Sequence, residues 1–150
     1  FFKSLYGGLQ AIVDVKLGPV LGKSPAEARP DLADSALSDR SLRNIAVMLE
    51  TLKALYLGPD NGKDSGGLQR LLMLSGEDAK LADLLPRAFD ITIATAKSVP
   101  EPLTRAVAAP NRRKAAEKLM LQTRALKQLI SQRLAPAIGL AVGFNALDGD

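Results

Sequence analysis

The stretch from Pro110 to Leu134 constrains the fold most, because its apolar residues recur every three or four positions along its whole length. One face of a helical projection carries Ala115, Leu119, Thr123, Leu126, Ile130 and Leu134. The other face carries Arg113, Lys114, Glu117, Arg124, Gln128 and Gln132. This spacing predicts a long amphipathic helix with one buried stripe. Other helices must cover that stripe, so we expect several packed helices.

Residues 1–16 show the same periodicity and predict a first helix. Nothing precedes its first residue to cap it, so we expect the chain to come from a larger parent protein. Residues 17–37 then form a long connection with prolines at Pro19, Pro25 and Pro30. Proline breaks a regular helix and restricts the residue before it. Connections of this length are uncommon in compact domains and often have a functional role.

Two more helices are expected between this connection and Pro110. Ser38 suits the N-cap of the first of them, with Asp39 at the positive end of the helix dipole, and Gly58-Pro59 ends it. The next is expected to start in the capping-type sequence of residues 75–78 and to end before Pro100. Both carry apolar residues at helical spacing.

Four long helices separated by turns predict an all-α fold, an antiparallel four-helix bundle with a long proline-containing loop between the first two long helices. Aromatic residues make up only 4% of the chain, which favours helix over sheet. We expect residues 1–150 to form a single helical domain, because this length is typical of one. No apolar run reaches the roughly 18 residues of a membrane span.

The chain has no cysteine and no histidine, which limits its chemistry. Disulfides, thiolate nucleophiles and Cys/His zinc sites are excluded, and any metal site of this chain must use oxygen ligands. A general acid or base must be a carboxylate, a lysine or a tyrosine. The net charge is +4, but acidic residues are interleaved with the basic ones and no aromatic side chain lies among them. We therefore expect a solvated helix face and no nucleic-acid partner.

Three sets of polar residues are candidates for a site. The closing segment presents oxygens from Asn145, Asp148 and Asp150 that suit a hard cation or an arginine; the alternative is a polar chain end. Arg40, with the nearby hydroxyls of Ser38 and Ser41, suits an anion; the alternative is an ordinary helix cap. Arg133 projects from the apolar flank of its helix, so we expect it to pair with an acidic residue or with the C-terminus of the helix.

Three short stretches resemble the C-terminal half of imelysin-like proteins, a bacterial iron-regulated group once classed as metallopeptidases. They are Lys16-Leu17-Gly18-Pro19 followed by Leu21-Gly22, then Ser38-x-Arg40-Ser41-Leu42, and the closing Gly143-Phe144-Asn145-Ala146-Leu147-Asp148-Gly149-Asp150. They occur in the family's order, span nearly the whole chain, and the last is the most specific. Ala36, Leu37 and Asp39 stand where the family usually has tryptophan, arginine and glycine, so the local shape is expected to differ there.

The resemblance implies an extracytoplasmic protein, in the periplasm or at the outer cell surface, with two related bundles and a site where they meet. The family's GxHxxE motif belongs to the first bundle, so the implied partner is an N-terminal bundle that carries it, in the same parent chain or separate. By position, Ser38, Arg40, Ser41 and Asn145 would bind a ligand, and Asp148 and Asp150 would bind the metal. The implied cofactor is iron or another oxygen-liganded cation. Contact with a membrane would come only through a lipid anchor upstream.

Three functions are compatible with the sequence. The resemblance favours a non-enzymatic component that binds metal or an iron-related ligand in bacterial iron uptake. The first alternative is a metallopeptidase of the imelysin type, for which this chain alone lacks the usual zinc ligands. The second alternative is a purely structural helical interaction domain, whose apolar faces would dock on a partner bundle.

Overall fold

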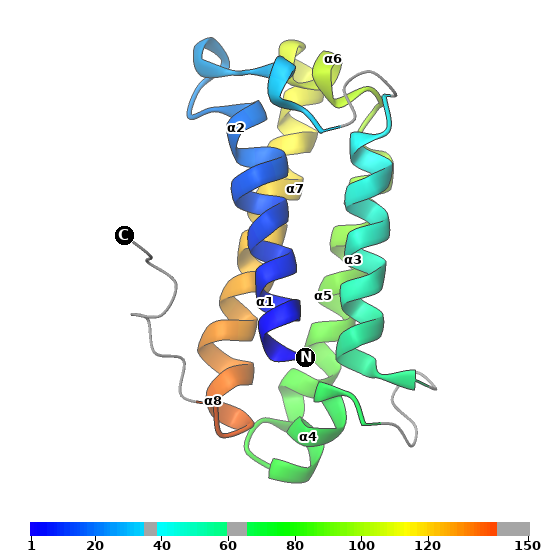
Figure 1. Cartoon of the computed structure of the whole chain (residues 1–150), viewed down its shortest axis with the longest axis vertical. Helices are drawn as coiled ribbons and strands as arrows, with labels where there is room; N and C mark the ends of the chain where they lie inside the picture. The colour runs from blue at the N-terminus through cyan, green and yellow to red at the C-terminus, as the bar shows by residue number, and fades with distance from the viewer. Residues whose placement is uncertain (35–38, 60–65, 141–150) are drawn as a thin grey trace.

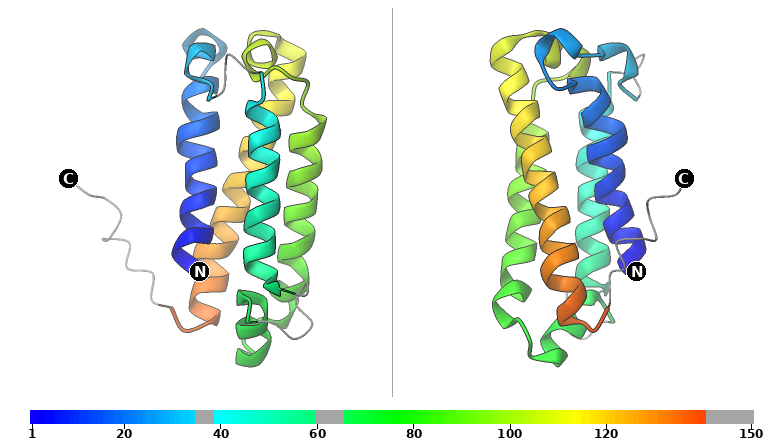
Figure 2. Two further views of the ribbon diagram at one scale, coloured as in Figure 1. Left: turned by 45° about the vertical axis from the view of Figure 1, so that its right-hand side comes forward. Right: turned by 90° about the vertical axis from the view of Figure 1, so that its left-hand side faces the viewer.

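The computed structural model describes residues 1–34, 39–59 and 66–140. Within these ranges the chain forms helices and no strand, so the prediction of an all-α fold is confirmed. Four long helical segments lie side by side, and successive segments run in opposite directions (Figure 1). Figure 2 shows the same arrangement from two other sides. In the described part of the chain, no helix has both the length and the apolar character that a membrane crossing requires.

The first long segment is longer than the sequence predicted. It consists of α1 (Phe2–Ala11), the π-helical turn η1 (Ile12–Leu17) and α2 (Gly18–Leu21). In the π-helical turn, the Gly18 N–H bonds to the Val13 carbonyl five residues back, and this wider turn accommodates the ring of Pro19. A Cβ on Gly18 would lie 2.7 Å from the same oxygen, so glycine is required at this point. The expectation that the helix ends near Lys16 is therefore wrong.

The proline-containing loop begins after α2 and reaches the start of α3. Pro25 and Pro30 each open a short 3-10 turn, η2 (Pro25–Glu27) and η3 (Pro30–Leu32). Proline suits these first positions because its fixed φ matches the turn and its missing N–H is not needed. At the second turn, Arg29 and Asp31 form an exposed, hydrogen-bonded ion pair at 2.8 Å, and this contact holds the pKa of Asp31 below its usual value.

The remaining helices complete the bundle. Their bounds are α3 (Ser41–Leu57), α4 (Leu68–Ser75), α5 (Ala79–Ser98), α6 (Leu103–Ala108), α7 (Pro110–Leu129), η5 (Ile130–Leu134) and α8 (Ala135–Ala137). Helix α3 packs on α1 and α5, and α7 packs on α5 and α1. The short helices α4 and α8 lie at one end of the bundle, and α2 and α6 lie at the other (Figure 1). The expected start of the third long helix is confirmed, since Asp78 Oδ1 accepts a 3.1 Å hydrogen bond from the Leu81 N–H.

The buried apolar side chains of the long helices form a single core. Among its fully buried members are Leu5, Leu9, Ile12, Ile45, Leu49, Leu85, Phe89, Leu119 and Ile130. Each such side chain contributes about 1.5–3 kcal/mol relative to exposure, which holds the helices together. Helices α1 and α3 approach closely at Gly8, where a Cβ would lie 2.6 Å from Leu52 Cδ2.

Helix α7 differs from its predicted orientation at one position. Arg113 was expected on the solvent face, but only 4% of its surface is exposed, and Ala116 is fully buried where Ala115 had been expected at the core. Arg113 lies three residues before Ala116, on the line of the buried stripe. The polar character of arginine hid this position, because sequence patterns place charged residues outside unless a buried partner is known.

Candidate functional site

The start of α3 and the end of the long loop meet η1 at one corner of the bundle. Arg40 is the residue before α3 and is exposed, whereas Ser41, the first residue of α3, is only 2% exposed. The hydroxyl of Ser41 donates a hydrogen bond to the backbone carbonyl of Asp34. Oδ2 of the Asp34 carboxylate in turn accepts a hydrogen bond from the ammonium group of Lys16. We call these four residues (Lys16, Asp34, Arg40 and Ser41) the loop corner.

Asp34 is the residue of the loop corner with unused bonding capacity. Its side chain is 34% exposed and that of Lys16 is 18% exposed, so the ion pair is partly shielded from water. The second carboxylate oxygen, Oδ1, is buried and accepts no hydrogen bond from a described residue. A buried carboxylate oxygen without a donor is costly, so it is suited to a donor or a cation supplied from elsewhere.

The N-terminus of α3 is capped by a residue that the sequence did not indicate. Glu101 Oε1 accepts a 3.0 Å hydrogen bond from the Arg43 N–H, across from the end of α5. This places a carboxylate at the positive end of the α3 dipole. Asp39 lies two residues before α3, with a φ of 55°, near the positive end of the helix dipole. Ser38, expected to be the cap, lies outside the described residues.

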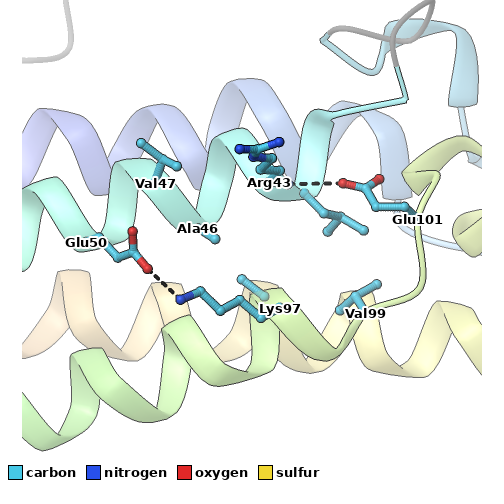
Figure 3. Close-up of a pocket in the computed structure, with 9 residues that line it drawn as sticks. Arg43, Ala46, Val47, Glu50, Lys97, Val99 and Glu101 are labelled. Carbon is cyan, nitrogen blue, oxygen red and sulfur yellow. Dashed lines mark hydrogen bonds and ion pairs between the residues drawn. The ribbon is translucent and has the colours of Figure 1, made fainter.

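A surface groove of about 400 Å³ runs from this capping contact along α3 and α5 (Figure 3). Its walls are the apolar side chains of Ala46, Val47 and Val99, and its far end carries the Glu50–Lys97 ion pair at 2.6 Å. Both partners of this pair are about half exposed, so the interaction is worth little in stability. The two carboxylates of the groove are engaged, which makes it a weaker candidate for a cation than Asp34.

The described residues contain only part of the predicted site. Arg40 and Ser41 lie together at the loop corner, as the sequence suggested, whereas Asn145, Asp148 and Asp150 lie outside the described residues. Within the described ranges, no three acidic residues are placed to hold a metal ion. A metal at the loop corner would therefore need ligands beyond Asp34.

The last described residue lies at the opposite end of the bundle from Arg40. The Leu140 N–H donates a 2.8 Å hydrogen bond to the carbonyl of Ala135, the first residue of α8. Helix α5, with 20 residues, spans about 30 Å between the two ends at about 1.5 Å per residue. The residues from Leu140 to Asp148 reach at most about 28 Å. Within one chain, Asp148 can therefore meet Arg40 only if this segment is fully extended and the two side chains cover the remaining distance.

Two residues of the loop corner, Lys16 and Asp34, are not indicated by the sequence. Lys16 belongs to a glycine-proline stretch that points to no ion pair, and nothing in the sequence around Asp34 marks it as functional. Neither has a local signal, because an ion pair between residues 18 apart becomes visible only once the loop is folded back on η1. The predicted partner for Arg133, in contrast, is confirmed: its Nη2 lies 2.7 Å from Asp78 Oδ2.

Comparison with known proteins agrees with the resemblance noted in the sequence. The chain matches the family model described as imelysin (peptidase M75) over residues 1–131. This range contains the whole loop corner and ends before the closing stretch at residues 143–150. No curated protein and no solved structure matches the chain significantly. Because the family model covers most of the sequence, the chain belongs to the imelysin family.

Proposed function

We propose that this chain binds a metal ion or an iron-related ligand in bacterial iron uptake, at a surface shared with an N-terminal bundle that carries the GxHxxE motif. The observation that carries the proposal is the buried Oδ1 of Asp34, which accepts no hydrogen bond from the described residues. Hard cations prefer carboxylate oxygens, and this chain has no histidine or cysteine to offer instead.

The loop corner supplies one part of such a site. Lys16 fixes the orientation of the Asp34 carboxylate by holding Oδ2, and Ser41 holds the Asp34 backbone, so Oδ1 keeps its direction. Exposed Arg40 stands next to them and suits an anionic group, such as a carboxylate of the ligand or of the partner bundle. The remaining ligands would come from the partner bundle. Asp148 and Asp150, near the end of the closing segment, would add further oxygens, whereas Asn145 is too close to Leu140 to reach the loop corner, since five residues span at most about 18 Å.

Calorimetric titration tests the proposal. The chain would be titrated with ferrous and ferric iron, calcium and zinc, first alone and then mixed with an N-terminal imelysin bundle that carries GxHxxE. We expect a saturable signal for iron in the mixture. Asp34→Asn is expected to weaken it by about tenfold or more, since it removes a charged ligand.

Asp90→Asn is the matched control, because Asp90 also pairs with a lysine, Lys53, at 2.6 Å, but lies away from the loop corner. It should leave the affinity for iron unchanged. The double variant Asp148→Asn/Asp150→Asn tests the closing segment separately. Absence of any metal signal in the mixture, or equal losses for Asp34→Asn and Asp90→Asn, contradicts the proposal. Casein hydrolysis by the mixture that disappears with a chelator would favour the metallopeptidase instead.

The same proposal assigns the protein to the periplasm or the outer cell surface, where iron is captured. Fractionation of cells that produce the full parent protein would test this. Recovery of the protein in the cytoplasmic fraction contradicts the assignment.

A further inference from the structure

A pocket separate from both the loop corner and the groove along α3 and α5 lies between α2 and α7. It has a volume of about 700 Å³, and its lining includes Leu21, Lys23, Arg113, Met120, Leu121 and Arg124. We call it the α2–α7 pocket. One wall is the tight bend after α2, where Gly22 has φ 63° and ψ −178° and a Cβ would lie 2.4 Å from the Glu27 carbonyl oxygen. This bend is essentially restricted to glycine, so the wall has a defined shape.

Arg113 lines the pocket and has one side-chain nitrogen without a partner among the described residues. Its Nε lies 2.7 Å from Glu117 Oε1, and its Nη2 lies 2.8 Å from the Leu21 carbonyl oxygen. Its Nη1 is buried and has no hydrogen-bond partner among the described residues. A guanidinium has five N–H donors, and donors left unpaired in a buried position cost free energy. Because Nη1 is covered by neighbouring atoms, Arg113 contributes positive charge to the pocket, and the exposed cations Lys23 and Arg124 make the direct contact with a ligand.

The charges around the pocket favour an anion. Lys23, Arg113 and Arg124 contribute three positive charges, and Glu27 and Glu117 contribute two negative ones. Glu117 is already paired with Arg113, and the side chains of Lys23 and Arg124 have no salt-bridge partner among the described residues. The pocket therefore keeps an excess of positive charge and of donors, which suits a carboxylate group.

The rest of the lining is apolar. Leu21 is buried, Met120 is partly buried, and Leu121 is 63% exposed at the rim although leucine normally avoids water. Apolar walls with a few convergent polar groups are typical of pockets for small organic molecules. We propose that the α2–α7 pocket binds a small amphipathic carboxylate, with its charged group toward Lys23, Arg113 and Arg124 and its apolar body against Met120 and Leu121.

The probe is octanoate, a carboxylate with a short alkyl body, added to the isotope-labelled chain and followed by amide chemical shifts. We expect saturable shifts centred on Gly22, Lys23 and Leu121. The double variant Lys23→Gln/Arg124→Gln should raise the dissociation constant by about tenfold, since each exposed charge contributes a factor of about three. It leaves Arg113 in place, so the fold is kept.

Lys114→Gln/Lys118→Gln is the matched control. It removes the same charge from exposed positions of α7 that do not line the pocket, and it should leave the dissociation constant unchanged. Octylammonium should not bind, and inorganic phosphate should bind much more weakly than octanoate. The proposal is overturned if octanoate does not saturate, if either comparison compound binds as tightly, or if the control variant weakens binding equally. None of these outcomes bears on iron binding at the loop corner.

Discussion

Arg113 Nη2 donates a 2.8 Å hydrogen bond to the carbonyl oxygen of Leu21, the last residue of α2. The carbonyls at the end of a helix have no partner within the helix, and a cation there also complements the helix dipole. This contact therefore joins the beginning of α7 to the end of the first long segment, 92 positions apart in the sequence. It explains how a charged side chain can be 4% exposed in a stable fold.

Replacing Arg113 by lysine is expected to lower the free energy of unfolding by about 2–4 kcal/mol, because a single ammonium cannot reach both Glu117 and Leu21 from a buried position. Urea denaturation measures this change. Arg112→Lys is the control, since Arg112 is exposed and its replacement should change stability by no more than about 0.5 kcal/mol. Equal effects for the two variants would mean that the buried contacts of Arg113 do not stabilise the fold.

Because Tyr56 is buried, we expect the fold to lose stability at alkaline pH. Burial, and to a lesser extent Asp83, raise the pKa of Tyr56 above its usual value of 10.0. The unfolded chain then releases the phenol proton above about pH 10 while the folded chain retains it. The stabilisation is complete below pH 10 and declines as pH rises, by up to about 1.4 kcal/mol per pH unit.

Tyr56→Phe should remove this part of the pH dependence. Urea denaturation of both proteins at pH 9 and pH 11 isolates it, because all other titrating groups are shared. The variant should be about as stable as the parent protein at pH 7, since the Tyr56 hydroxyl has no hydrogen-bond partner among the described residues. If the unfolding free energies of the two proteins changed equally between pH 9 and pH 11, Tyr56 would not be the source of the alkaline loss of stability.

Asp78 carries two interactions, one with each carboxylate oxygen. Oδ1 caps α5 and Oδ2 pairs with Arg133 of η5. Asp78→Ala should therefore cost about 1–2 kcal/mol of unfolding free energy, whereas Arg133→Gln, which removes only a partly exposed ion pair, should cost less than about 1 kcal/mol. Thermal or urea denaturation compares the two. A larger loss for Arg133→Gln would mean that the cap is unimportant.

Two glycine substitutions should change stability in opposite directions. Gly22→Ala places a side chain in a backbone conformation restricted to glycine and against the Glu27 carbonyl. It should therefore lower the free energy of unfolding by at least about 1–3 kcal/mol. Gly7→Ala adds a methyl group to helix α1 where no atom lies within 4 Å, so it should stabilise by about 0.5–1 kcal/mol. The melting temperatures of both variants test these two predictions, and a lower melting temperature for Gly7→Ala would contradict the second one.

The helices were predictable because burial follows local periodicity. Leu119, Leu126 and Ile130 are buried as their spacing predicted. The end of the first segment was not predictable, because Pro19 usually breaks a helix and only the π-helical turn at residues 12–17 accommodates it. The candidate site was predictable only in part, since Arg40 and Ser41 are neighbours in sequence, whereas Lys16 and Asp34 are brought to them by the folding of the loop.

By itself the sequence determined the all-α class, the buried stripes, the cap at residues 75–78 and the membership of a family, because each depends on residues close together in the chain or on short motifs. Only the tertiary structure decided that Glu101 caps α3, that Arg113 is buried against Leu21, and that Asp34 keeps an oxygen without a donor among the described residues. The first two contacts join residues 58 and 92 positions apart, and the third depends on what surrounds a buried atom. Local propensity carries no information about such pairs, since their energy exists only once the helices have packed.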